Sequence, residues 1–210
     1  MELLSAQQFA GFLGAAVLIT LSPGPDNLMV LSLGAARGRK LGMAFGLGCA
    51  IGCLSHTFLA ALGVSALIAA SPWAFLALKV AGGLYLIRLG WLALRSSAGV
   101  RVGQAEGGAE SAGRLFAKGL VANAINPKVI MFFLAFLPQF VAAERGDAPW
   151  QILQLGLLFT LQAALLFGSL GYFAGRVGQW LNRRPRAGLW LDRVAGAIFV
   201  GLGLRLMVAR

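Results

Sequence analysis

Asp26 is a carboxylate inside a long apolar stretch, directly after the proline-rich segment Ser22–Pro25. Ionisable residues within membrane-type hydrophobic segments are costly, so they are functional candidates by default. Asp26 could take up a proton or face a cationic ligand group. It could also cap a helix together with Asn27, because both side chains accept hydrogen bonds from the free N–H groups of a helix start. The sequence leaves both roles open.

Two prolines around one glycine, Pro23, Gly24 and Pro25, predict a break in the first hydrophobic segment. Each proline lacks the N–H that an α-helix needs and clashes with the preceding turn. In hydrocarbon the freed backbone groups must find partners or line a water-filled cavity. We therefore predict irregular backbone buried within the protein, where substrate binding or gating could occur. A simple proline kink is the alternative.

A second polar group surrounds Pro127 and consists of Asn123, Asn126 and Lys128. The Asn-Pro pair predicts another break, with a new helix starting behind it. A cation near a helix start is unfavourable with the helix dipole, so we expect Lys128 to have a partner, either Asp26 or a bound anionic group. The alternative is a lysine side chain that extends to the membrane interface. Like the residues of the first break, these three residues and Pro127 are candidates for substrate binding or gating.

Four more side chains within apolar segments could do chemistry. His56 could carry protons because its ordinary pKa is about 6.5, and a neutral imidazole bonded across helices is the alternative. Gln162 is a candidate for polar lining, with the same alternative. Cys49 and Cys53 lie four apart, on one face of a helix. We interpret them as packing thiols; a redox pair is the alternative, although it lacks the Cys-X-X-Cys spacing.

The composition indicates an integral membrane protein. Hydrophobic residues make up 59% of the 210 residues and charged residues 12%, against about 25% charged in a typical soluble domain. Leu41–Ala70 contains 30 residues without a Lys, Arg, Asp or Glu, and about 20 apolar residues suffice to cross a bilayer. One histidine predicts neither a histidine-based catalytic triad nor a zinc cluster. We expect no enzyme, no cofactor and no metal site.

We predict an all-α fold of six transmembrane helices in one transporter domain, residues 1–210. Helices 1 and 4 are expected to be broken. The expected spans are Leu3–Leu33, Leu41–Ala70, Trp73–Leu94, Leu115–Val141, Trp150–Gly175 and Leu189–Val208.

The two halves of the chain resemble each other in hydropathy and proline position. We predict repeat one at 1–94, a mobile cytoplasmic linker at 95–114 and repeat two at 115–210. Three spans per half invert the second repeat relative to the first. Broken helices at matching places in inverted repeats are typical of a secondary transporter with its site near the bilayer midplane.

Positive charge is distributed unequally between the loops. Three loops hold 12 basic residues, and the other side holds only Arg145 and Arg210. Basic loops stay in the cytoplasm, so both termini are predicted to lie outside it. The net charge of +11 is thus explained by topology, and nucleic acid is not an expected partner. Glycine-rich helix faces permit a homodimer.

The sequence resembles the LysE/RhtB amino-acid exporters along nearly its whole length. The segment Ser22–Leu28 and the glycine-spaced span after it are similar to the first half of that family. Ala81–Gly90 resembles its third span. Asn126–Lys128 and Phe136–Phe140 resemble its fourth span.

This resemblance implies export of amino acids or close derivatives across the bacterial inner membrane, driven by the proton gradient. We expect the substrate carboxylate near Gly24–Asn27 or Asn126–Lys128, where half-helix N–H groups point. The ammonium would face Asp26 or freed carbonyls, and protonation of Asp26 or His56 would couple transport. A cation or metal-ion transporter and a thiol-redox protein using Cys49 and Cys53 are the alternatives.

The charge distribution predicts the topology. In a background with Cys49 and Cys53 replaced by serine, single cysteines are placed at Arg39, Arg101 and Arg184. We expect a membrane-impermeant thiol reagent added outside intact cells to leave all three unlabelled, because these loops face the cytoplasm. Rapid labelling at position 101 from outside would contradict the predicted orientation.

Overall fold

The computed structural model describes residues 3–64, 71–96, 110–142 and 146–208. Every regular element within these ranges is a helix. The first half comprises α1 (Ala6–Leu21), α2 (Pro25–Arg37), α3 (Arg39–Leu59) with the π-turn η1 (Ala60–Val64), and α5 (Pro72–Leu94). The second half comprises α6 (Ala112–Ala124), α7 (Pro127–Met131), η2 (Phe132–Phe136), η3 (Leu137–Phe140), α8 (Ala148–Tyr172), α9 (Ala174–Arg183) and α10 (Pro185–Val208).

Local sequence explains where the broken helices begin and end. Ser5 starts α1 in a capping box with Gln8. Pro25 occupies the first turn of α2, where its missing N–H costs nothing. Pro127 does the same for α7, behind the cap residue Asn126. Both predicted breaks are therefore present, with bends of 58° between α1 and α2 and 48° between α6 and the segment Pro127–Phe140.

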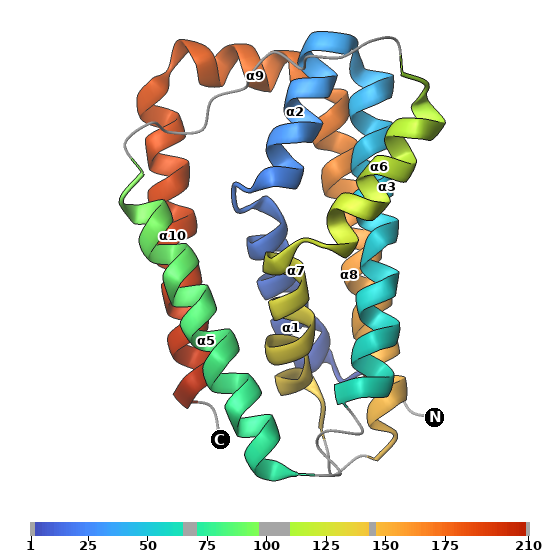
Figure 1. The fold of residues 1–210 in the computed structure, drawn as a ribbon, viewed down its shortest axis with the longest axis vertical. Coiled ribbons are helices and arrows are strands. Elements are labelled where there is room, and N and C mark those ends of the chain that lie inside the picture. The colour runs from blue at the N-terminus through green and yellow to red at the C-terminus, as the bar shows by residue number, and fades with distance from the viewer. Residues whose placement is uncertain (1–2, 65–70, 97–109, 143–145, 209–210) are drawn as a thin grey trace.

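In the described residues, three helices are long and apolar enough to cross a membrane, or five if each bent pair counts as one span. The predicted sixth span, Leu189–Val208, lies within α10, which has 24 residues. It is not among the five, and it includes Asp192, Arg193 and Arg205. α10 packs along α5, however, as a pair at one side of the bundle (Figure 1). Six spans thus remain a prediction.

The segment after the fifth span differs from its prediction. The sequence predicted helix to Gly175 followed by a basic loop, but α8 ends at Tyr172 and α9 follows at once. α9 lies across the upper end of the bundle (Figure 1). Its buried residues Ala174, Gly178 and Leu181 share one face at helical spacing. Such a short amphipathic helix has no long apolar run, so a search for spans misses it.

The predicted linker 95–114 is shorter at its end than expected. Residues 97–109, including Arg101, lie outside the described residues. Ser111 caps α6 through its hydroxyl, and helix begins at Ala112 rather than at Leu115. The mobility predicted for the linker stays a prediction.

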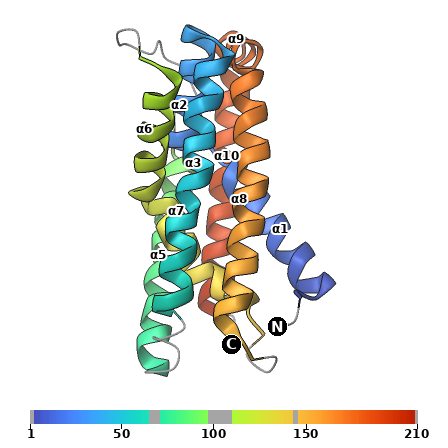
Figure 2. The ribbon, with the colours of Figure 1, turned by 90° about the vertical axis from the view of Figure 1, so that its right-hand side faces the viewer.

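The two broken helices lie side by side in the bundle. Figure 1 shows the α1–α2 break and the α6–α7 break near the middle of the long axis. Seen from the side, α1 tilts away from the other helices toward its start (Figure 2). The ends of α2 and α9 lie at the upper end of the bundle, together with the start of α6 (Figure 1). Apart from Arg95 at the end of α5 and Arg184 between α9 and α10, the described basic residues of the three predicted cytoplasmic loops belong to these elements or to the adjoining first turns of α3 and α10.

Glycines allow the closest helix contacts. A Cβ at Gly48 of α3 would overlap the carbonyl oxygen of Phe116 in α6, and one at Gly119 would overlap that of Phe45. Small residues of this kind let membrane helices approach to backbone contact. The α3–α6 contact matters for the site because α6 leads directly to the second break.

We predict that Gly48→Ala destabilises the protein by about 1–3 kcal/mol, the range for overpacking a tight core. The added methyl group would push α3 away from the backbone of α6. Thermal unfolding of the detergent-purified protein measures the effect. Gly14→Ala is the control, because no described atom lies within 4 Å of its added Cβ. Equal melting temperatures for the two variants would contradict the role assigned to Gly48.

Candidate functional site

Lys128 satisfies the backbone groups freed by the first break. Pro23 has no N–H, so the carbonyl of Ile19, four residues earlier, lacks its helical donor. The Lys128 ammonium donates to that carbonyl at 3.1 Å and to the carbonyl of Ser22 at 3.0 Å. Lys128 is 8% exposed. The sequence predicted Asp26 or a bound anion as its partner, whereas its hydrogen-bond partners are two carbonyls.

Asp26 connects the first break to the second. Its Oδ2 accepts hydrogen bonds from Nδ2 of Asn123 at 3.1 Å and from Nδ2 of Asn126 at 2.9 Å. A carboxylate only accepts, which fixes the orientation of both amides. Asp26 lies in the first turn of α2 and is 4% exposed. Gly24, and not Asp26, occupies the cap position of α2. The hydrogen bonds of the Asp26 carboxylate go instead to the other broken helix.

Asn123 is a hub between the breaks and α3. Pro127 lacks an N–H, so the carbonyl of Asn123 accepts from the backbone N–H of Asn126 at 2.9 Å and can take a second donor. That carbonyl lies 3.1 Å from Nε2 of His56, which must therefore carry the hydrogen. The amide oxygen of Asn123 accepts a hydrogen bond from the Cys53 thiol at 3.4 Å. His56 is thus hydrogen-bonded across helices, and its role in proton coupling stays a prediction.

The backbone around the second break approaches the first closely. The Asn126 side chain caps α7 by accepting from the backbone N–H of Lys128 at 3.0 Å. The Lys128 ammonium then reaches Gly24, where an added Cβ would lie 3.1 Å from its Nζ. Any larger residue at Gly24 would press on this ammonium.

Thr20 organises a second polar group behind the break. Its carbonyl accepts from Nδ2 of Asn27 at 2.8 Å, and its hydroxyl accepts from Nε2 of Gln162 at 2.8 Å. In the described residues, three buried oxygens have no hydrogen-bond partner: Asn27 Oδ1, Thr160 Oγ1 and Gln162 Oε1. Unpaired buried acceptors are costly, so this is where a donor from a ligand or water would be stabilised.

A small cavity lies between the charged groups. It offers about 10 Å³ to the centre of a water molecule, room for about one water. Asp26, Asn123 and Lys128 line it, together with Thr20 and Cys53. Phe132, Phe159 and Phe167 close its apolar walls. No amino acid fits in this volume, so the site is closed in this conformation.

The structure therefore gathers most of the predicted site residues. Asp26, Asn123, Asn126 and Lys128 meet at the two breaks that Pro23, Pro25 and Pro127 create, and His56 joins through Asn123. Asn27 and Gln162 lie on the side of Thr20.

Sequence reasoning missed Thr20 and placed Cys53 among packing residues. Thr20 is a polar residue shortly before Pro23 in an apolar run, which is a weak signal. Both cysteines are free and buried, and Cys49 does not line the cavity. Within the described part of the chain, no three His, Cys, Asp or Glu side chains could hold a metal ion together.

Opposite charges buried at two helix breaks, among helices of membrane length, are features of a membrane transport protein. The chain belongs to the LysE type translocator family, whose sequence model matches residues 17–210. It is therefore a transporter and not an enzyme, as predicted.

Relatives cover nearly the whole chain. It is 33% identical to an uncharacterized membrane protein of Pseudomonas aeruginosa over 100% of this chain and 99% of that protein. It is 33% identical to the threonine efflux protein of Escherichia coli K12, covering 92% of this chain and 94% of that protein. A leucine efflux protein of Enterobacter sp. is 31% identical, with 94% of each chain covered. No solved structure matches the chain.

We predict that Cys53→Val destabilises the protein by about 1–3 kcal/mol, because it leaves the buried amide oxygen of Asn123 without a donor. Cys53→Ser is the matched control, since its hydroxyl retains the donor. Thermal unfolding in detergent compares the two. A valine variant at least as stable as the serine variant would show that the thiol contributes only packing.

Proposed function

We propose that this protein exports amino acids or close derivatives from the bacterial cytoplasm, and that the two facing breaks form its substrate site. One observation supports this most: a carboxylate and an ammonium are buried around one cavity, each held by neutral partners. An amino acid carries the same two charged groups. The names of the threonine and leucine efflux relatives point to the same substrate class.

The internal hydrogen bonds suggest how a substrate binds. The Lys128 ammonium occupies the carbonyls of Ile19 and Ser22, while two asparagine amides occupy Asp26. An incoming ammonium takes over those carbonyls or Asp26, and the incoming carboxylate takes Lys128. Substrate thus replaces internal partners of the charged groups, and no charge is left unpaired in the membrane interior.

Alternating access requires the closed site to open on one side at a time. Above the site lies the end of the bundle that carries most of the basic residues, which we call the basic end. α2 and α6 lie on either side of the route from this end to the site. Below it, aromatic rings pack together: Phe12 lies 5.9 Å from Phe132 by ring centroids, and Phe159 lies 5.3 Å from Phe132 and 5.0 Å from Phe133. We assign the aromatic group to the outer closure. The breaks are the natural hinges, because no continuous helix crosses them.

The architecture proposed for this cycle is a pair of inverted repeats, 1–94 and 115–210, joined by the linker 95–114. Each half runs from a broken helix through a long helix, α3 or α8, to a third, α5 or α10. The collection of basic residues at one end of the bundle supports a multi-pass inner-membrane protein with both termini outside. The glycine faces of α3 pack within one chain, so they do not themselves require a homodimer.

Proton coupling is proposed at Asp26, with His56 as the second candidate. Both connect to Asn123, Asp26 through the amide and His56 through the carbonyl. Protonation of Asp26 weakens its two amide hydrogen bonds, because a neutral acid is a poorer acceptor than a carboxylate. Release of Asn123 and Asn126 would free the second break to move.

Asp26→Asn and Lys128→Ala are each expected to lower the export rate at least about tenfold. Asp26→Asn removes the negative charge proposed to face the substrate ammonium, and Lys128→Ala leaves the buried carbonyls of Ile19 and Ser22 without their donor. Counterflow of L-threonine and L-leucine in proteoliposomes measures the rate, and immunoblotting of membranes measures insertion. Lys40→Ala, an exposed cation at the basic end, is the control and keeps the rate. Near-normal counterflow in both site variants would refute the proposed substrate site.

A further inference from the structure

A second, larger pocket opens at the basic end of the bundle. Its volume is about 380 Å³, and it extends between α2 and α6 from Pro25 at the break to Arg37, Glu110 and Lys118. This volume lies within the range of about 300–1,000 Å³ that is typical of small-molecule sites. It is also far larger than the closed cavity between Asp26 and Lys128.

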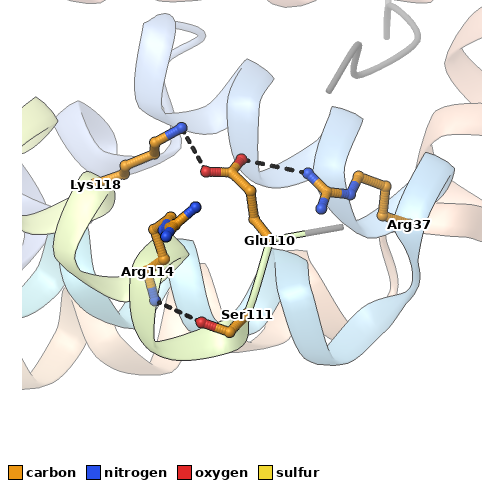
Figure 3. Close-up of polar contacts among 5 residues, drawn as sticks. All are labelled: Arg37, Glu110, Ser111, Arg114 and Lys118. Atoms are coloured by element: carbon orange, nitrogen blue, oxygen red, sulfur yellow. Dashed lines mark hydrogen bonds and ion pairs between the residues drawn. The ribbon is translucent and has the colours of Figure 1, made fainter. Parts of the chain in front are cut away.

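Three charged side chains, Arg37, Glu110 and Lys118, line this pocket. Figure 3 shows the two cations on either side of the Glu110 carboxylate. The Glu110 carboxylate pairs with Lys118 Nζ at 2.6 Å through Oε1 and with Arg37 Nη1 at 3.5 Å through Oε2. Arg37 is 14% exposed, Glu110 18% and Lys118 58%. Glu110 thus connects the end of α2 to the first turns of α6, across the mouth of the pocket.

This arrangement differs from an ordinary surface ion pair. Two cations share one carboxylate, so the group keeps one unit of positive charge. The remaining lining is mostly apolar and includes Leu28, Met29 and Leu115. A carboxylate bound between Arg37 and Lys118 would therefore place an attached aliphatic group against the apolar walls.

On the basis of the proposed function, we propose that this pocket is a cytoplasmic loading site for the amino acid. Arg37 and Lys118 bind the α-carboxylate of the substrate, and Glu110 occupies their carboxylate position while the pocket is empty. Substrate displaces Glu110 and separates α2 from α6. The pocket then leads to Pro25, beside Asp26 of the inner site.

The substrate carboxylate, rather than protonation of Glu110, separates Glu110 from Arg37 and Lys118. The hydrogen bond from Lys118 and the neighbouring Arg37 hold the pKa of the Glu110 carboxyl below its usual range. The stabilising charge is therefore complete at neutral pH and is lost only as pH falls through that lowered pKa. Arg114, the other charged residue shown nearby, is a cation and would favour the same state (Figure 3).

Transport kinetics in inside-out vesicles test the proposal with L-threonine and L-leucine as probes. Glu110→Gln removes the competing carboxylate, so the KM should fall by roughly twofold to fivefold, the range for a solvent-accessible ion pair. Arg37→Gln and Lys118→Gln should raise the KM by a similar factor. Lys40→Gln controls for surface charge and should leave the KM unchanged.

Labelling gives a readout that does not depend on turnover. Ser32→Cys places a thiol in the pocket, in the Cys49→Ser, Cys53→Ser background. L-Threonine should slow its reaction with a maleimide, and L-threoninamide, which lacks the carboxylate, should not. Adding Glu110→Gln should make the thiol react faster with the maleimide. It should also lower the L-threonine concentration that is needed to protect the thiol.

The outcomes separate this inference from the proposed function. If the unaltered protein transports none of the common amino acids, the proposed function and the loading site both fail. If it transports them, but Glu110→Gln leaves the KM unchanged or raises it, the loading site alone is refuted. Equal protection by L-threonine and L-threoninamide would refute it as well.

Discussion

A proline cannot donate a hydrogen bond to the carbonyl four residues before it, and the site depends on this constraint. In a soluble protein, water can donate a hydrogen bond to such a carbonyl. Within a membrane, the protein itself must supply the donor. Pro23 leaves the carbonyl of Ile19 to Lys128, and Pro127 leaves that of Asn123 to the backbone N–H of Asn126 and to His56. Each break thus draws in a side chain from a different part of the chain, and the two breaks are held together.

The same constraint explains why buried charges are tolerated here. Lys128 rests on carbonyl dipoles and Asp26 on amide dipoles, so each charge is solvated by groups that are themselves neutral. Neutral partners are exchanged for a ligand more readily than a direct ion pair, because no new unpaired charge is created when they leave. In a direct ion pair, by contrast, the removal of one partner leaves an uncompensated buried charge.

The sequence was sufficient to predict the breaks and the polar residues around them, because a proline next to a buried Asp or Asn is a local signal. It was insufficient to predict which donor fills each freed carbonyl. That choice depends on how helices about 100 residues apart in sequence pack, as Lys128 and Ile19 do. Glu110 was missed for a similar reason: it stands in a glycine-rich polar stretch, and its two partners lie on helices that only the fold brings to it.

Two helices, α2 and α6, connect the charged groups of the inner site with those of the pocket at the basic end. α2 carries Asp26 in its first turn and Arg37 in its last, and its 13 residues span about 20 Å. α6 follows Glu110, carries Lys118 and reaches Asn123 near its end. A change in the angle between α2 and α6 at the mouth therefore also changes the distance between Asp26 and Asn123 at the break. Displacement of Glu110 would strain the bonds that close the inner site, which connects loading with opening through two short helices.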